Sequence, residues 1–347
     1  MAKYEDNKKL DYSVLLKELK QDGLEKLYML WGPEDYLIRD FAERLRTLCL
    51  PEGADEFNAK RLDGPVPDPR DLEEAVNAMP FFGDRTFVEV RDADVNRWKD
   101  ELFSAVLKDI PDWCTVVITL PAGASPDGRL GLVKQIKKDG KAVEFTSQAD
   151  RLLYPWIRKR FASHGKTIQN DAIDRLTFIS GELMNQLIPE IDKICTYTRA
   201  EQIGVEDVEK LANHIPEAKV FDMTDAIADG KYDKAMYHLY DLLAGDSEPV
   251  EIMGSIGWQM RQLYAARLVI DSGNGAAYLK ELLGISNSYR LNKLMDTARK
   301  YSSDTLSNDL RLIADYSLLP REKGAVMTDL EALKELLIRF AMEKRHA

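Results

Sequence analysis

The sequence predicts an α/β domain with a mostly parallel sheet, followed by two all-helical domains. Short apolar runs of strand length alternate with amphipathic helical stretches up to about residue 150. Strand signals stop after that point, and the 347 residues are too many for one typical domain. We therefore expect domains at residues 1–150, 151–215 and 216–347, with a joint between the last two near residues 215–222.

Strands and helices of the first domain follow from apolar spacing. A continuous apolar run at 27–32 ends in glycine and is typical of a buried parallel strand. Further strands are predicted at 86–90, 114–120 and 141–145, and helices at 13–21, 34–50 and about 99–108. In the helix at 34–50, the residues at helical spacing are Leu37, Ile38, Phe41, Leu45 and Leu48.

A further helix is expected to begin at about Asp71, after a turn rich in Asp and Pro at 63–71. Its apolar face would consist of Leu72, Ala75, Val76 and Met79. Pro80 limits the continuation of this helix because proline cannot donate the backbone hydrogen bond.

The remainder of the chain is predicted to be helical. Helices are expected at 151–165, 170–181, 182–198 and 205–215, with Gly165, Gly181 and Gly204 near their ends. From residue 216 onward the pattern is all helical and includes long stretches at 248–273 and 328–344.

Two adjacent phenylalanines stand in the stretch AMPFFGDR at 78–85. Neighbouring side chains point to opposite faces of a strand and lie about 100° apart on a helix, so one core rarely takes both. Pro80 ends the preceding helix and Gly83 permits a turn, so Phe81 and Phe82 are placed where both can protrude.

Composition indicates an ordinary globular protein of a reducing compartment. Cys49, Cys114 and Cys195 lie far apart in apolar settings and predict buried thiols. The polar N-terminus lacks the apolar core of a signal peptide, and no stretch is long enough to span a membrane, so we expect a cytoplasmic protein. With a net charge of −11, any contact with DNA requires a local basic patch or partners.

A nucleotide site would be expected at the strand–glycine–helix junction around Gly32. Phosphate binding by a P-loop requires a second glycine, a lysine and a hydroxyl residue in the pattern G-x-x-x-x-G-K-[ST]. All three are missing here, and Glu34 and Asp35 would repel a triphosphate. The junction therefore predicts a degenerate P-loop and no nucleotide cofactor.

Searches for other chemistry give no catalytic or metal site. Asp92 and Asp94 follow a predicted strand, but a solvated turn explains them better than a metal site because no further ligands accompany them. The histidines fall in unrelated contexts without ligand spacing; they are His164, His214, His238 and His346. Signatures of serine or cysteine nucleophiles and of dinucleotide binding are also missing.

Two basic clusters and one tryptophan each allow a structural and a functional interpretation. The clusters are Lys134, Lys137, Lys138 and Lys141, and Arg158, Lys159, Arg160 and Lys166. Ordinary solvated helix faces are the simpler explanation, and contact with phosphates or an acidic partner is the functional one. Trp258 is better explained by helix packing than by base stacking.

The chain resembles the delta-subunit family of the bacterial DNA polymerase III clamp loader over nearly its full length. The resemblance is carried by LYMLWGPEDYLIRD, AMPFFGDRTFVEVRDAD, ELMNQLIPEIDKICTY and VFDMTDAIADGKYDKAMYHLYDLL, in this order and spacing. The last continues into IMGSIGWQMRQLYAARLV and LIADYSLL. The sequence departs from the family at Leu319 and Pro320, where members often have a lysine and a small residue.

This resemblance implies an AAA+-like parallel-sheet domain, a small helical lid-like domain and a C-terminal helical collar that mediates oligomerisation. It implies an accessory subunit of a DNA-directed DNA polymerase holoenzyme that neither binds nor hydrolyses nucleotide. The implied partners are the beta sliding clamp, the gamma/tau and delta-prime subunits, and primed DNA within the assembled complex. The implied clamp-binding residues are Met79, Pro80, Phe81, Phe82 and Gly83.

Two alternatives stay open at the level of sequence. One is an active P-loop ATPase of the same superfamily, against which the missing lysine argues. The other is a helical scaffold unrelated to replication, with Phe81 and Phe82 packed in its core. Binding or hydrolysis of Mg-ATP by the isolated chain would favour the first alternative. Exposure of the two rings and binding to the clamp distinguish a clamp-loader subunit from the second.

Overall fold

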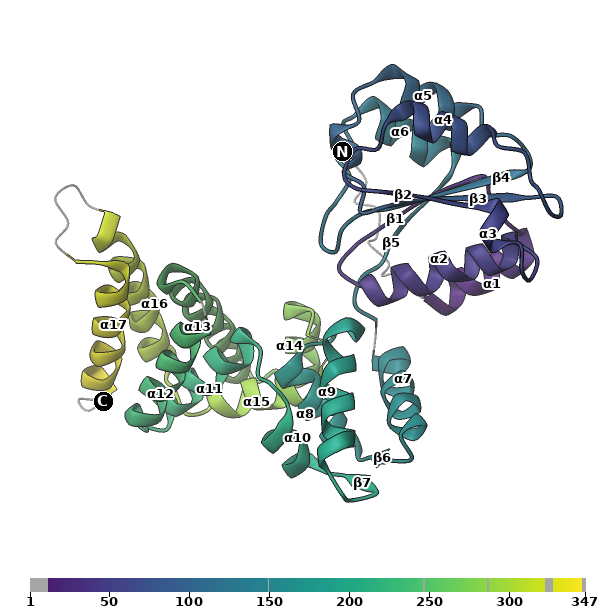
Figure 1. Ribbon diagram of the computed structural model, residues 1–347. Helices are drawn as coiled ribbons and strands as arrows, with labels where there is room; N and C mark the ends of the chain where they lie inside the picture. Colours follow the sequence, from purple (N-terminus) through teal and green to yellow (C-terminus); the bar gives the residue numbers. More distant parts are fainter. Residues whose placement is uncertain (1–11, 149, 246, 286, 322–326, 345–347) are drawn as a thin grey trace. The chain divides into compact units, whose positions relative to one another are not determined.

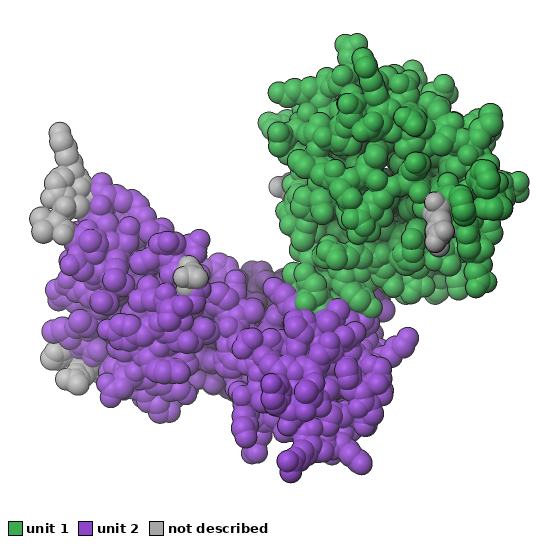
Figure 2. Space-filling model, in the orientation of Figure 1, with its two compact units in different colours: residues 1–148, 183–185 green, residues 149–182, 186–347 purple. Residues whose placement is uncertain are grey.

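The computed structural model describes residues 12–148, 150–245, 247–285, 287–321 and 327–344. Within it the chain forms two compact units (Figure 2). The first unit consists of residues 1–148 together with the short segment 183–185, and the second consists of residues 149–182 and 186–347. Each unit has its own buried apolar side chains.

A five-stranded parallel sheet in the order β2-β3-β4-β1-β5 forms the centre of the first unit (Figure 1). Its strands are β1 (Leu27–Trp31), β2 (Ala59–Asp63), β3 (Thr86–Arg91), β4 (Cys114–Thr119) and β5 (Lys141–Glu144). All residues of β1 and β4 are buried, which explains their continuous apolar sequences. The four strands predicted in this region are confirmed.

Strand β2 was not predicted, because its sequence AKRLD has no apolar run. It lies at the edge of the sheet and pairs only with β3, with Lys60, Arg61 and Asp63 exposed. Charged side chains are common on edge strands, where they discourage pairing with other chains. The neighbouring strand therefore decides the conformation of this segment.

Helices cover both faces of the sheet (Figure 1). One face carries α1 (Tyr12–Asp22), α2 (Asp35–Cys49) and α3 (Asp55–Asn58). The other carries α4 (Pro69–Asn77), α5 (Glu101–Lys108) and α6 (Gly131–Asp139), with a short 3-10 helix, η1 (Val95–Arg97), before α5. The predicted helices at 13–21, 34–50 and 99–108 are confirmed.

The predicted stripe of α2 is correct except at its last member. Leu37, Ile38, Phe41 and Leu45 are buried, whereas Leu48 is 57% exposed. In the final turn the neighbouring Cys49 faces the sheet instead, and its Sγ lies 3.4 Å from the carbonyl oxygen of Thr86. Cys49, Cys114 and Cys195 are all buried and free, which confirms the predicted buried thiols.

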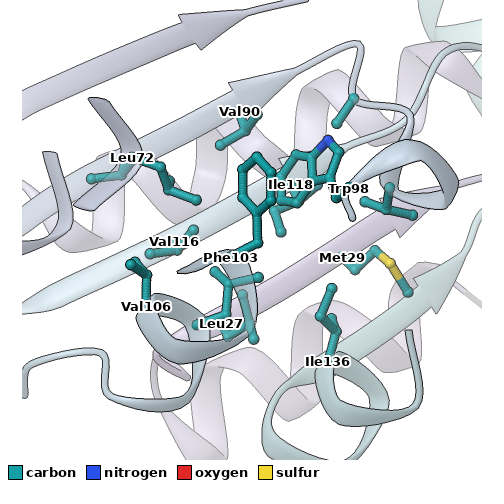
Figure 3. Close-up of a cluster of buried hydrophobic side chains, with 14 of the residues drawn as sticks. Leu27, Met29, Leu72, Val90, Trp98, Phe103, Val106, Val116, Ile118 and Ile136 are labelled. Atoms are coloured by element: carbon teal, nitrogen blue, oxygen red, sulfur yellow. The ribbon is translucent and has the colours of Figure 1, made fainter. Parts of the chain in front are cut away.

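A core cluster of the first unit lies between the sheet and helices α4, α5 and α6 (Figure 3). Trp98 stacks on Phe103 with ring centroids 4.5 Å apart, and its Nε1–H donates to the carbonyl oxygen of Pro65 at 2.9 Å. The aromatic pair therefore buries its apolar surface while the polar indole nitrogen remains hydrogen-bonded.

The second unit is almost entirely helical. It contains α7 (Asp150–Ser163), α8 (Asn170–Ser180), most of α9 (Met184–Tyr197), α10 (Val205–Leu211), α11 (Pro216–Ala228), α12 (Tyr232–Ala244), α13 (Pro249–Asp271), α14 (Ala276–Leu283), α15 (Ser288–Ala298), α16 (Ser303–Leu318), the 3-10 helix η2 (Leu319–Arg321) and α17 (Asp329–Lys344). Helix α13 packs against α11 and against α14 to α17, and it buries Ile256, Met260 and Leu263 among other side chains.

The expectation that strands stop after residue 150 is wrong at two places. Strands β6 (Thr167–Ile168) and β7 (Gln202–Ile203) form a two-stranded parallel sheet. Two residues are too few for a periodic pattern, so sequence spacing gives no signal for them. The division into residues 1–150, 151–215 and 216–347 stays a prediction. Among the described residues, no helix is long and apolar enough to cross a membrane.

Candidate protein-binding surface

Helix α4 leads directly to the two adjacent phenylalanines. It begins at Pro69, close to the predicted Asp71, and the Asp68 side chain caps it by accepting from the backbone N–H of Arg70 at 2.8 Å. The helix buries Leu72, Ala75 and Val76 against the sheet, as predicted. Its orientation is therefore fixed by the core of the first unit.

Met79 does not belong to the apolar face of α4, contrary to the sequence-based expectation. The helix ends at Asn77, and Ala78 already has extended backbone angles of φ −60° and ψ 128°. Helical spacing applies only where the backbone is helical, so the register that buries Val76 no longer directs Met79 inward. Its side chain is 80% exposed.

Phe81 and Phe82 both lie outside the core, with exposed fractions of 71% and 48%. Their rings meet edge to face, with centroids 4.8 Å apart and planes at 82°. This is a favourable arrangement for two aromatic rings. The pair therefore presents contiguous apolar surface, which excludes the alternative that both rings are core residues.

A third ring, Phe57 of α3, completes an aromatic cluster that sequence reasoning missed. Its ring stacks on Phe81 at 5.3 Å and meets Phe82 edge-on at 5.2 Å. Phe57 is itself 54% exposed. The short segment DEFN has no periodic pattern, so nothing in the sequence places Phe57 beside residues 81 and 82. Phe57, Phe81 and Phe82 thus form one aromatic cluster.

The buried side chain of Asn58 connects α3 to the loop that carries the pair. Its Oδ1 accepts from the backbone N–H groups of Phe81 at 2.9 Å and Phe82 at 3.1 Å. Its Nδ2 donates to the carbonyl oxygen of Arg85 at 2.9 Å and also to that of Phe82. Asn58 is only 2% exposed, so these bonds are shielded from water.

Gly83 turns the chain immediately after the aromatic pair. Its φ of +69° lies in the left-handed region, which glycine adopts without strain. A Cβ at this position would lie 3.2 Å from Cγ of Pro51. Pro80, on the other side of the pair, is partly buried. The loop conformation therefore depends on both the glycine and the neighbouring Pro51.

Gly32, at the degenerate P-loop, is required by the packing of the protein itself. Its φ is +126°, and an added Cβ would lie 2.2 Å from the carbonyl oxygen of Phe145. The next turn is closed by a hydrogen bond from the N–H of Glu34 to the same carbonyl at 3.2 Å. Close approach of two backbone segments therefore explains this glycine without a phosphate.

The Glu34 side chain is fully buried beside this turn. It accepts from the backbone N–H of Met184, the first residue of α9, at 2.9 and 3.2 Å from its two oxygens. Burial raises the pKa of Glu34 to about 7, although the hydrogen bond from Met184 opposes the shift. A buried carboxyl thus lies in the turn where a P-loop would bind phosphate.

Comparisons with known proteins give a consistent result. Residues 28–146 match the family described as "DNA polymerase III, delta subunit", and residues 217–318 match "DNA polymerase III delta subunit, C-terminal domain". Together the two matches cover well over half of the chain. The chain belongs to the DNA polymerase III delta-subunit family.

Individual members of the delta-subunit family are similar along most of their length. The chain is 26% identical to the DNA polymerase III subunit delta of Bacillus subtilis over 333 residues, which is 93% of this chain and 94% of the relative. It is 22% identical to a probable DNA polymerase III subunit delta of Aquifex aeolicus over 295 residues, 82% of this chain and 83% of the relative.

A solved structure supports the fold. The Bacillus subtilis DNA clamp loader delta protein matches with a TM-score of 0.51 and 22% identity, covering 96% of this chain and all of that chain. The predicted fold class is confirmed in that a parallel-sheet α/β domain is followed by a helical region. The division of that region into two domains stays a prediction. The family match ends at residue 318, immediately before the departure predicted at Leu319 and Pro320.

The other candidate residues of this delta-subunit family member belong to other segments of the chain. Asp92 is exposed with a left-handed φ of 56°, and Asp94 precedes η1. His164 contacts Asp192, whereas His214 lies near Glu209 and Asp222. Burial lowers the pKa of His238, and His346 lies outside the described residues. No cluster of three metal-ligating side chains occurs among the residues described.

The two basic clusters differ in their surroundings. Lys134, Lys137 and Lys138 are exposed on α6, with Nζ of Lys137 5.4 Å from the Trp31 ring centroid.

The second cluster is largely engaged within its own unit. Arg160 pairs with Asp192 at 2.9 Å, and Lys166 donates to the carbonyl oxygens of Thr198 and Ala200 after α9.

Trp258 belongs to helix α13 and is 43% exposed. The guanidinium carbon of Arg290 lies 4.8 Å from its ring centroid. Such a cation–π contact occupies one face of the indole ring. Trp258 is therefore a half-exposed ring with one cation–π partner, and its predicted role in helix packing stays a prediction.

Proposed function

We propose that this chain is the clamp-loader subunit that binds the sliding clamp and favours its open form, so that the ring can be loaded onto primed DNA. The observation that carries the proposal is the exposure of Phe81 and Phe82 on a loop fixed by the core, in a member of the delta-subunit family. Met79, Pro80 and Gly83 flank the pair and complete the proposed contact.

Burial of the two rings supplies a substantial part of the free energy that binding to the clamp requires. Burying an aromatic side chain contributes about 1.5 to 3 kcal/mol, so two rings supply about 3 to 6 kcal/mol before the cost of association. Hot spots of protein interfaces commonly consist of such aromatic side chains in an apolar pocket. The exposed Met79 would add apolar area and exclude water at the rim.

Ring opening follows from differential binding. A subunit shifts the clamp toward the open form only if it binds that form more tightly than the closed form. We propose that the rigid first unit binds the open clamp protomer in this way and performs no covalent chemistry. In this role the chain is an accessory subunit of the polymerase holoenzyme, acting in the cytoplasm.

Nucleotide hydrolysis is assigned to other subunits. The missing lysine and hydroxyl residue, together with the buried Glu34 at the degenerate P-loop, support a chain that does not bind ATP. The proposed partners are the beta clamp, the gamma/tau and delta-prime subunits, and primed DNA in the complex. Residues 216–347 would form the collar through which the subunits associate, and residues 151–215 the lid-like domain.

The decisive experiment measures binding of the full chain to the sliding clamp of the same organism by isothermal titration calorimetry. We expect the variant with Phe81→Ala and Phe82→Ala to lose at least about 100-fold in affinity, because about 3 kcal/mol or more of burial is removed. Tyr237→Ala with Tyr240→Ala is the matched control, because both tyrosines are exposed on α12 of the second unit.

The control variant should bind the clamp as the wild type does. Circular dichroism should show that both variants are folded. Equal affinity of the Phe81, Phe82 variant and the wild type, or no measurable binding by the wild type, would contradict the proposed function.

A further inference from the structure

We infer that the clamp-binding surface has a second segment, α3, in which Phe57 is a third contact residue and Asn58 positions Phe81 and Phe82. The inference rests on the proposed function. It extends the surface to residues separated from the aromatic pair by more than twenty positions in the chain. It also assigns a role to a buried side chain that does not itself touch the clamp.

Phe57 supplies apolar surface continuous with that of the pair. Its ring contacts both Phe81 and Phe82, yet more than half of its side chain stays exposed. Scattered exposed apolar residues are normal on a protein surface, but contiguous ones indicate an interaction site. A pocket that receives Phe81 would therefore also cover the outer face of the ring stacked on it.

Asn58 uses the full hydrogen-bonding capacity of its amide on one loop. A carboxamide has one oxygen that can accept two hydrogen bonds and one nitrogen that can donate two. Here the oxygen accepts from Phe81 and Phe82, and the nitrogen donates to Phe82 and Arg85. One buried side chain thus fixes both phenylalanines at the backbone, directly beneath their exposed rings.

Preorganisation of the loop explains why the hydrogen bonds of Asn58 affect binding to the clamp. Ordering a mobile loop during association costs free energy, and a loop that is already ordered avoids that cost. Asn58 orders residues 81–85 in the free protein without adding contact area. The effect of Asn58 on the affinity for the clamp should therefore depend on the presence of the two rings.

The contact role of Phe57 is tested with Phe57→Ala in the full chain, by calorimetric titration with the sliding clamp. We expect a loss of about 5- to 50-fold in affinity. Phe57→Leu should retain most of the affinity, because it preserves apolar volume. Leu48→Ala is the matched control, because Leu48 is an exposed apolar residue of the same unit at 57% exposure. Wild-type affinity of Phe57→Ala would overturn the contact role.

The positioning role of Asn58 is tested with two variants. Asn58→Ala removes all four bonds, whereas Asn58→Asp can still accept from Phe81 and Phe82 but cannot donate to the carbonyls. The second variant keeps the test valid if the first does not fold. Hydrogen–deuterium exchange of the peptide covering 78–85, followed by mass spectrometry, should be accelerated in both.

Asn96→Ala is the matched control for the loop. Asn96 likewise connects a short helix, η1, to a loop of the first unit, donating to the carbonyl oxygen of Ser125 at 3.1 Å and accepting from the N–H of Asp127 at 2.7 Å. We expect this variant to leave both the exchange of peptide 78–85 and the affinity for the clamp unchanged.

A double-mutant cycle separates positioning from general loss of structure. Asn58→Asp is measured in the wild type and in Phe81→Leu. If Asn58 acts through the rings, its roughly 10-fold loss of affinity shrinks in the Phe81→Leu background, while its effect on the unfolding midpoint is equal in both. An equal loss of affinity in both backgrounds would overturn the positioning role.

The remaining outcomes distinguish this inference from the proposed function. Wild-type affinity of Phe57→Ala and Asn58→Asp, with binding lost in the Phe81, Phe82 variant, overturns the inference and leaves the proposed function intact. No clamp binding by the wild-type chain overturns both.

Discussion

The carboxyl group of Glu34 accepts a hydrogen bond from the backbone N–H of Met184, a residue 150 positions further along the chain. Both residues belong to the first unit, since the segment 183–185 packs with residues 1–148. The buried carboxyl lies in the turn that would receive a phosphate in a functional P-loop.

The raised pKa of Glu34 predicts a pH-dependent stability. Its pKa is about 7 in the folded protein against 4.5 ordinarily, so between these values the folded state retains a proton that the unfolded chain has lost. The free energy of unfolding should therefore fall by about 1 to 3 kcal/mol as the pH rises through this window. This contribution is fully present below pH 4.5 and lost above about pH 7.

Glu34→Gln tests this assignment, because glutamine can still accept from Met184 but does not titrate. Urea denaturation at about pH 5 and about pH 8 should show a smaller decline in the variant than in the wild type. Glu73→Gln, on the exposed face of α4, serves as the control. Equal pH dependence of wild type and Glu34→Gln would contradict the assignment.

Gly32→Ala should destabilise the first unit strongly even when no nucleotide is present. The new Cβ would lie 2.2 Å from the carbonyl oxygen of Phe145, at a φ of +126°. We expect a loss of about 3 kcal/mol or more in the free energy of unfolding, because strain and overlap combine. Gly128→Ala is the control, since a Cβ there meets open space. A loss below about 1 kcal/mol would contradict the packing explanation.

Gly83→Ala should weaken both the loop and clamp binding. The left-handed φ of +69° and the 3.2 Å approach to Pro51 predict a cost of about 1 to 2 kcal/mol, measured by thermal denaturation. Because the strain lies next to Phe82, the affinity for the clamp should fall by about 3- to 10-fold. An unchanged affinity, with the stability loss present, would show that the turn does not orient the pair.

The full chain should not bind Mg-ATP at millimolar concentration. The degenerate P-loop has no lysine for the phosphates, and the buried Glu34 side chain lies in the turn that would hold them. Calorimetric titration with Mg-ATP checks this expectation, and an assay of phosphate release checks hydrolysis. Saturable binding or hydrolysis by the purified chain would instead support an active ATPase.

Local sequence patterns determined the elements with strong apolar periodicity. The runs at β1 and β4 and the stripe of α2 are long enough for burial to dictate residue type, so these elements were predictable. The same holds for the loss of P-loop chemistry, because a missing lysine is visible without coordinates. The order of four apolar stretches was sufficient to indicate the delta-subunit family.

Tertiary structure decided the features that depend on distant neighbours. Strand β2 exists because β3 offers hydrogen bonds to a charged edge segment, and β6 and β7 pair over two residues each. Met79 is exposed because α4 ends at Asn77, two residues before it, although the spacing placed it on the buried face.

The candidate surface shows most clearly which features follow from the sequence and which depend on the tertiary structure. The sequence singled out Phe81 and Phe82 because two adjacent large rings are difficult to bury together. It could not show that Phe57 stacks on them or that Asn58 fixes their backbone, since those contacts join segments more than twenty residues apart. Residue type determines which side chains need a partner, whereas the fold of the whole unit decides which partner lies within reach.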